Sequence, residues 1–208
     1  MEKIGEVETV NPANYVIPGY LVMFVFMAAA VAAEAIVTER QNRTLERLLV
    51  ISARREAILG GLFLGTAAKG LVQILIFWGV GMALFHIDMG IAPAAVILLS
   101  VLMVIMSSAF AIMLATFAKT RRSAASMAVV MSLILAPLGG CWWPLFVTPR
   151  WMQFIAKFTP HGWANTGFNN LMVFGGDFSS AVPAILALCG FSVAFFFLAA
   201  LRFRTSAN

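Results

Sequence analysis

Two polar side chains stand inside a long apolar run and could contribute chemistry there. Lys69 lies in the run from about 57 to 85, and Gln73 follows one helical turn later. In a helix, Lys69 would lie about 15 Å beyond Leu59, near the middle of a bilayer. Its ammonium group could face a cavity that admits a polar or anionic part of a transported compound, or it could reach the membrane surface or a neighbouring carbonyl. The sequence alone favours neither.

Glu34 is an acidic side chain about one turn before the end of the first apolar run, which spans roughly 15 to 38. A carboxylate at this depth is costly to bury alone, but it can pair with arginines of the polar loop that follows. We therefore interpret Glu34 as a structural anchor.

The longest polar interruption between apolar runs extends from Thr38 to Gly61 and holds five of the fourteen basic residues. Its middle predicts a short helix, because Leu45, Leu48 and Leu49 share one face by their spacing while the charged residues point elsewhere. Such a helix could present an apolar ridge to a protein partner. The alternative is a solvated loop whose arginines contact anionic lipid headgroups.

Motifs for enzymatic chemistry are missing from this sequence. His86, Asp88 and His161 do not make the three or four converging ligands that a zinc site needs, and we interpret them as a solvated turn and an interfacial ring. No Gly-rich ATP cradle, H-E-x-x-H or G-x-S-x-G occurs, and Cys141 and Cys189 lack a ligand spacing. We assign no catalytic residue, metal or bound cofactor to this chain, and an enzyme embedded in the membrane is the less favoured alternative.

Composition places the chain in a membrane. Of its 208 residues, 62% are apolar and 11% are charged, with a mean hydropathy of +0.94. These are too few polar side chains to cover a soluble globule. Five apolar runs are each long enough to cross a hydrocarbon core of about 30 Å, and lipid tolerates such runs only as helices. The expected fold class is an all-α polytopic membrane protein with spans at about 15–38, 57–85, 92–118, 123–147 and 183–202.

The basic residues indicate the orientation of these spans. Ten of them fall in the loop after the first run, the turn after the third and the C-terminal segment, whereas Lys3, Arg150 and Lys157 fall on the other side. Because positive loops stay cytoplasmic, we expect the N-terminal tail 1–14 outside and the C-terminal tail 205–208 inside the cell. The charges form no single stripe, so we expect a lipid bilayer and no nucleic acid as a partner. The expected location is the cell membrane of a bacterium or archaeon.

Residues 140–182 form the longest connection and are rich in aromatic side chains, including Trp142 and Trp143, which Pro144 follows. Aromatic residues at this density favour the membrane interface. The stretches 150–158 and 162–174 are each long enough for a short helix, so we expect a re-entrant or surface-lying helical pair. Gly61 and Gly65 allow close packing between helices. We expect this packing to occur within one bundle rather than between two copies of the chain.

Taken together, the stretch from Glu39 to Gly60 resembles the acidic-basic T-L-E-x-L-L segment of permease subunits of type-2 ABC exporters. The second half of the chain is similar to that family's glycine pair, W-P, P-x-W and T-P landmarks, at Gly139-Gly140, Trp143-Pro144, Pro149-Arg150-Trp151-Met152 and Thr159-Pro160. The resemblance covers residues 15–204, which we treat as one transmembrane permease domain.

Two features depart from the family pattern. Pro18-Gly19-Tyr20 is similar to the start of the family's second helix, so we expect the chain to lack the first transmembrane helix. Many members have Lys after the glycine where this chain has Gly61, so no interaction of that Lys is carried over.

The resemblance implies a coupling helix at about 43–52 that docks into a cytoplasmic ATPase subunit, which binds ATP and Mg, and a second permease copy or paralogue. The implied ATPase contacts are Arg43, Thr44, Leu45, Glu46, Arg47, Leu48 and Leu49. The implied function is export of a hydrophobic or amphipathic compound of the drug, lipid or glycan class, along a path lined by the first, second and fourth helices. We place Lys69, Gln73, Trp142, Trp143 and Pro144 on that path. A non-transporting membrane scaffold or a truncated relic is the alternative.

Overall fold

The computed structural model describes residues 11–43, 47 and 55–205 of this chain. Helices make up nearly all of this part, and no strand occurs among the described residues. The long helices are α1 (Ala13–Gln41), α3 (Arg55–Phe85), α4 (Pro93–Phe117), α5 (Arg121–Leu138) and α8 (Phe178–Thr205), and the short ones are α6 (Arg150–Ala156), α7 (Pro160–Met172) and a 3₁₀ turn at Leu145–Val147.

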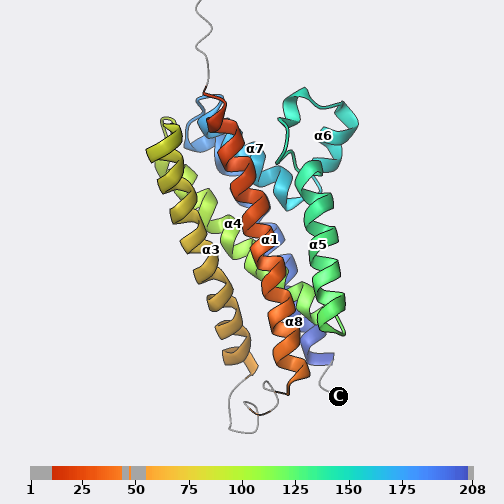
Figure 1. The fold of residues 1–208 in the computed structure, drawn as a ribbon. Coiled ribbons are helices and arrows are strands. Elements are labelled where there is room, and N and C mark those ends of the chain that lie inside the picture. Colours follow the sequence, from red (N-terminus) through yellow and green to blue (C-terminus); the bar gives the residue numbers. More distant parts are fainter. Residues whose placement is uncertain (1–10, 44–46, 48–54, 206–208) are drawn as a thin grey trace, which may run out of the picture.

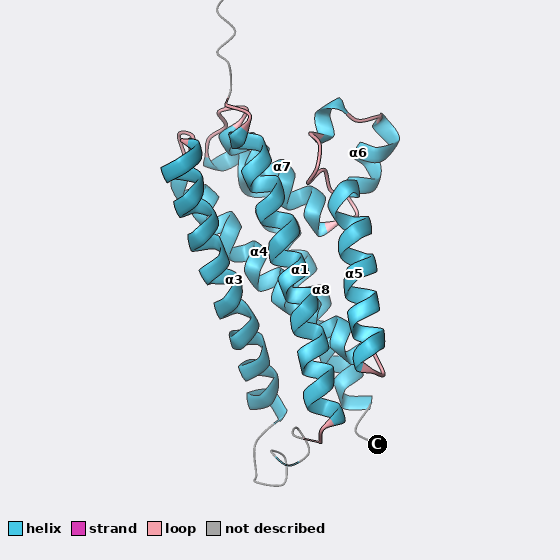
Figure 2. Cartoon of the chain, in the orientation of Figure 1, coloured by secondary structure: helices cyan, strands magenta, loops and turns pink. Residues whose placement is uncertain are grey.

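All five long helices have the length and hydropathy needed to cross a membrane. The predicted all-α polytopic class is therefore confirmed. Figure 1 shows α1 in the middle of one face, with α3 on one side and α5 on the other, while α4 and α8 lie behind. Figure 2 shows that the loops of the described part lie toward the two ends of the bundle.

The two ends of the bundle differ in chemistry. At one end α1, α4 and α8 finish and α3 and α5 begin, and we call it the basic end because its helix termini and turns carry Arg40, Lys119, Arg121, Arg122 and Arg202. We call the other the aromatic end, since the segment between α5 and α7 exposes Trp142, Trp143, Trp151, Phe154 and Phe158 there.

Helix α4 forms the centre of the bundle, where it packs against α8, α1, α3 and α7. Its serine hydroxyls would be costly at this position without partners. Ser100 donates to the Val96 carbonyl at 2.7 Å and Ser108 to that of Val104 at 2.8 Å, while the Trp78 indole donates to Ser100 at 3.0 Å. These serines are therefore satisfied within the bundle, and α4 is the most buried of the five spans.

Helix α5 ends at Leu138, well before the predicted end of the fourth span at 147. The amide of Gly140 donates to the Pro137 carbonyl and that of Cys141 to the Ala136 carbonyl, which is the Schellman arrangement of a helix end. It needs a residue with positive φ, and Gly140 has a φ of 73°. The glycine pair and Pro144 therefore stop the helix where apolarity alone predicts that it continues.

The segment between α5 and α8 contains the two short helices that the sequence predicts. One of them is exposed at the surface and the other is buried in the bundle. Helix α6 exposes Trp151 and Phe154, as expected at a membrane interface. Helix α7 instead packs against α8, α1 and α4, and its residue Phe168 is fully buried. The Thr159 hydroxyl caps α7 by accepting from the Gly162 amide at 3.0 Å.

The start of α7 meets the end of α5 at glycine positions. A Cβ atom on Gly139 would collide with the Cβ of His161 and would come within 2.8 Å of the Gly162 nitrogen. The Asn165 side-chain nitrogen donates to the carbonyls of both Gly139 and Gly140. Glycine is therefore required at 139 by the close approach of two helices.

We predict that Gly139→Ala lowers the stability of the bundle by about 1–3 kcal/mol, because the added methyl group must push α7 away from α5. Thermal unfolding of the purified protein in detergent measures this. The matched control is Gly190→Ala in α8, where nothing lies within 4 Å of the new Cβ. That change should stabilise the helix by about 0.5–1 kcal/mol. Equal stability of Gly139→Ala and the parent protein would contradict the close approach.

Candidate functional site

The predicted ATPase contacts begin where α1 ends at the basic end. Arg43 directly follows the last turn of α1 and has a φ of 57°, and its carbonyl accepts from the Arg47 amide at 3.1 Å. Both arginines are exposed. The other predicted contacts, Thr44, Leu45, Glu46, Leu48 and Leu49, lie outside the described residues, as does most of the predicted helix 43–52.

The last turns of α1 hold the turn between α4 and α5. The Arg121 guanidinium, at the start of α5, pairs with Glu34 at 2.6 Å, and its backbone amide donates to the Gln41 side chain at 3.3 Å. Arg40 donates to the Ala115 carbonyl at 3.2 Å and also to that of Ala118, both at the end of α4. We call these contacts the α1 clamp.

The clamp gives Glu34 a partner that its place in the sequence does not indicate. Among the described residues Glu34 pairs with Arg121, the first residue of α5. Pairing with an arginine of the loop after α1 stays a prediction, because most of that loop lies outside the described residues. Cationic donors such as Arg40 are favourable at the C-terminal carbonyls of a helix, where the backbone dipole is negative. The clamp therefore ties α1 to two helices that are distant in sequence.

A groove of about 150 Å³ runs between α1 and α5. We call it the α1–α5 groove, and it is lined by Met23, Met27, Ala30, Val31, Glu34, Ala125, Ala128, Val129, Ser132, Leu133 and Trp142. Its walls are apolar, Glu34 stands toward its basic end and Trp142 toward its aromatic end. The buried Ser132 hydroxyl has no hydrogen-bond partner among the described residues. The groove can therefore hold an apolar chain with a hydroxyl group.

A second groove, of about 160 Å³, lies between α1 and α3, and we call it the α1–α3 groove. Ile76 and Val80 of α3 line it. Gln73 and Lys69 precede Ile76 by one and two turns, so both lie on the same side of α3 as the groove. Lys69 is exposed and Gln73 half-buried in this chain. Lys69 and Gln73 therefore lie on the groove side of α3, between the groove and the basic end.

The three predicted aromatic-end residues are not grouped with Lys69 and Gln73. Trp142 lines the α1–α5 groove, and its indole donates to the Met23 sulfur at 3.1 Å. Trp143 packs edge-on against Trp142 with ring centroids 5.9 Å apart, and Pro144 precedes the 3₁₀ turn. Helix α1 separates the two sets, so the predicted site consists of two grooves on either side of one helix.

Gly61 and Gly65 do not pack against the described part of the bundle as expected. Among the described residues, nothing lies within 4 Å of a Cβ built on either position. The side of α3 that carries them is therefore open in this chain.

Helix α7 places polar side chains in the interior that the sequence reading missed. His161 is 1% exposed, its ring lies 3.8 Å from that of Phe26, and neither ring nitrogen has a partner among the described residues. Burial lowers its pKa, so the imidazole is neutral. Asn165 and Asn169 follow at four-residue spacing and are also buried. The four-residue spacing of these three polar side chains is the sequence signal that identifies a polar face on α7. The interpretation of His161 as an interfacial ring was wrong, because the side chain is buried in the bundle.

No group of three or more histidine, cysteine or acidic side chains that could hold a metal ion occurs among the described residues. Cys141 is buried and its pKa is raised by burial, so it is a neutral thiol.

Comparison with known proteins agrees with this arrangement. A family model described as ABC-2 family transporter protein matches residues 4–201. The linearmycin resistance permease protein LnrN of Bacillus subtilis (strain 168) is 31% identical over 177 residues, which cover 85% of this chain and 45% of the relative. The chain thus spans about half the length of the curated relative it matches. Since the family match extends over nearly the whole chain, this chain belongs to the ABC-2 transporter family as a multi-pass membrane permease.

Proposed function

We propose that this chain is the membrane-spanning half of an exporter that moves a hydrophobic or amphipathic compound out of the cytoplasm. A separate ATPase subunit supplies the energy, and a second permease copy or paralogue completes the complex. The observation that carries this proposal is the α1 clamp, because it joins the segment expected to dock the ATPase to helices that line a groove.

The basic end faces the cytoplasm in this proposal. Arg40, Lys119, Arg121, Arg122 and Arg202 gather there, and basic residues near spanning helices are retained on the cytoplasmic side. The aromatic end then faces outward, with its exposed tryptophans at the outer interface.

Movement of the docking segment would reach the grooves through α1. Arg43 follows α1 without a linker, so a displacement of the segment acts directly on a continuous helix of 29 residues. Through Glu34, Gln41 and Arg40, the clamp passes that displacement to the start of α5 and the end of α4. Closure of two ATPase subunits would thus switch the helices between two packings, rather than bend one of them.

The cargo path lies on the face formed by α3, α1 and α5, where both grooves open. A second permease set against this face would enclose them. The walls are apolar, with few polar groups: Lys69 and Gln73 on one side of α1, and Glu34 and Ser132 on the other. A compound with a long apolar part and a few polar groups suits such a path.

Nucleotide chemistry belongs to the partner in this proposal. ATP and Mg would bind the ATPase subunit, and this chain would hold no cofactor. The relative is described as a linearmycin resistance permease. Linearmycin is therefore the first compound to test as cargo.

We predict that Leu48→Asp abolishes co-purification with the ATPase, because a charge would replace an apolar anchor of the docking ridge. The loss of such an anchor costs about 2–4 kcal/mol, a weakening of roughly thirtyfold or more. Affinity purification of the tagged chain co-expressed with the ATPase measures this. Leu48→Met, which keeps the apolar volume, should retain the complex. An unchanged complex with Leu48→Asp would contradict the docking helix.

We predict that Lys69→Ala combined with Gln73→Ala reduces export, because both polar groups on the α1–α3 side of the path are lost. Linearmycin accumulation in cells expressing the chain and its ATPase should rise several-fold, with the complex intact. Leu71→Ala is the control, since Leu71 lies about half a turn away at the same depth. Unaltered export by the double variant would remove the case for a path along this groove.

We predict that Glu34→Gln reduces export without loss of ATPase binding, because it breaks the charge pair of the clamp. A partly exposed pair is worth about 0.2–1 kcal/mol, so the effect should be about 1.4- to fivefold. The reversed pair, Glu34→Arg with Arg121→Glu, should recover part of the export rate. If Glu34→Gln, Glu34→Arg alone, Arg121→Glu alone and the reversed pair all export like the parent protein, the clamp does not transmit force.

A further inference from the structure

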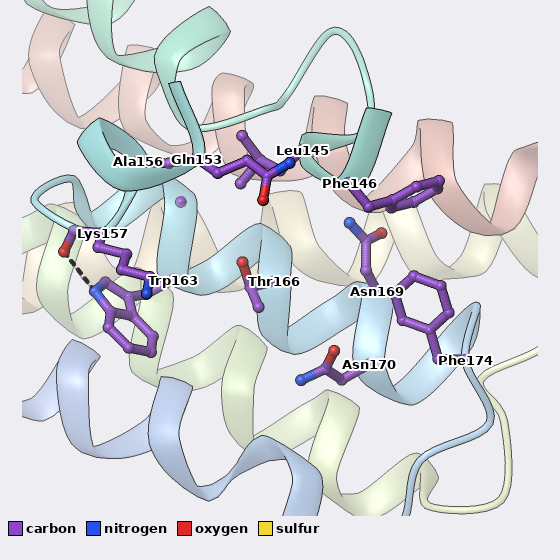
Figure 3. Close-up of a pocket in the computed structure, with 11 residues that line it drawn as sticks. Leu145, Phe146, Gln153, Ala156, Lys157, Trp163, Thr166, Asn169, Asn170 and Phe174 are labelled. Carbon is purple, nitrogen blue, oxygen red and sulfur yellow. Dashed lines mark hydrogen bonds between the residues drawn. The ribbon is translucent and has the colours of Figure 1, made fainter. Parts of the chain in front are cut away.

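A cavity of about 240 Å³ lies at the aromatic end between α7 and the segment that contains the 3₁₀ turn and α6. It is distinct from the two grooves beside α1. Figure 3 shows Gln153 and Leu145 on one side, Thr166 and Asn169 of α7 on the other, and aromatic rings at both ends. We call it the α6–α7 cavity.

Asn169 is the most informative residue of this cavity. It is 4% exposed and lines the cavity, yet its Oδ1 atom has no hydrogen-bond partner among the described residues. A buried acceptor without a partner costs about 1–3 kcal/mol. A donor group held in the cavity would supply the missing hydrogen bond.

Two further amides of the cavity each have one donor already engaged. Gln153 donates its Nε2 to the Thr148 carbonyl at 2.8 Å, and Asn170 donates its Nδ2 to the Ser180 carbonyl at 3.2 Å. Their side-chain oxygens are left as acceptors, and Figure 3 shows the Gln153 oxygen directed toward Thr166. An occupant must therefore donate hydrogen bonds as well as accept them.

This requirement selects the chemical class of the occupant. Lys157 lines the cavity and would attract an anion, but an anion has no donors for the oxygens of Gln153 and Asn170. The amide of Gly162, at the start of α7, is already capped by Thr159. A cation would be repelled by Lys157, the one charged residue that lines the cavity. A hydroxyl group both donates and accepts, so it matches amides and Thr166 alike.

The ends of the cavity fit the apolar faces of a ring. Phe146 and Phe174 pack with centroids 5.3 Å apart at one end, and Trp163, fixed by its indole bond to the Lys157 carbonyl at 2.7 Å, stands at the other. Aromatic walls with a few placed polar groups are typical of ligand sites. The volume of about 240 Å³ lies below the roughly 300–1,000 Å³ of sites for drug-sized ligands, so a small group suits this cavity.

We propose that the α6–α7 cavity binds a neutral, hydroxyl-rich group, such as a single sugar ring or a polyol head. The group can belong to a free molecule or to the headgroup of a membrane lipid. The proposal does not rest on export, because binding to this cavity requires neither the ATPase nor the grooves beside α1.

The test uses the full chain in nanodiscs and two neutral probes. Saturation-transfer NMR measures binding of methyl β-glucoside to discs of phosphatidylcholine, and native mass spectrometry measures retention of glucosyl diacylglycerol added to the discs. Binding of the free glucoside supports a soluble source, and retention of the glucosyl lipid alone supports a lipid source. Inorganic phosphate and phosphatidic acid are the anionic comparisons.

We predict that Asn169→Leu weakens binding of the neutral probe about tenfold while it maintains or raises the melting temperature. A purely structural amide would give the opposite pattern, a lower melting temperature with unchanged binding. Thr166→Val should also weaken binding, and Thr116→Val in α4, distant from the cavity, is the matched control. The proposal is overturned if neither neutral probe binds, if both cavity variants bind like the parent protein, or if phosphate or phosphatidic acid displaces the neutral probe.

Discussion

The carbonyl groups at the end of α5 impose the constraint on which the aromatic end depends. A helix that stops within or near lipid leaves backbone acceptors that water cannot reach, so protein donors must supply the bonds. Tyr15 of α1 donates to the Gly140 carbonyl at 2.7 Å, and Asn165 of α7 donates to the carbonyls of both glycines. One helix end therefore fixes the position of two other helices. The glycine pair is needed twice, for the positive φ of the turn and for the close approach of α7.

Helix α1 is held at both ends by contacts of different kinds. At the aromatic end, Tyr15 donates to the α5 turn and Gly19 lies where a Cβ would come within 2.6 Å of the Cys141 carbonyl. At the basic end, Arg40 and Glu34 reach side chains and carbonyls of the turn between α4 and α5. Gly19 and Cys141 are buried at the aromatic end, whereas the Arg121 side chain of the basic contact is largely exposed. The basic contact is therefore the one that can break and re-form at low cost, as a moving part requires.

The bundle is unevenly packed, and this unevenness separates structural surfaces from functional ones. Helix α4 is the most buried of the spans, while α3 is mostly exposed and has no described neighbour within 4 Å of a Cβ on Gly61 or Gly65. Apolar side chains on α1 and α3 are exposed beside both grooves, including Phe24, Val31 and Ile76. In a membrane this surface meets lipid or another protein. Lys69 and Gln73 lie beside this surface, and lipid tails offer them no hydrogen bonds. A protein can offer such bonds, so these two residues favour a second permease as the neighbour.

The sequence by itself determined the five spans, the family resemblance and the basic end, because these follow from hydropathy, local motifs and charge counts. It located two short helices before the last span for the same local reason. Only the tertiary structure decided that α5 stops at Leu138, that Glu34 pairs with Arg121, and that His161 and Asn169 are buried. A helical sequence specifies which residues share a face, but not which neighbour that face meets. Partners such as Arg121, far from Glu34 in the chain, and the burial of α7 depend on how the helices pack, and that information does not lie in any one segment.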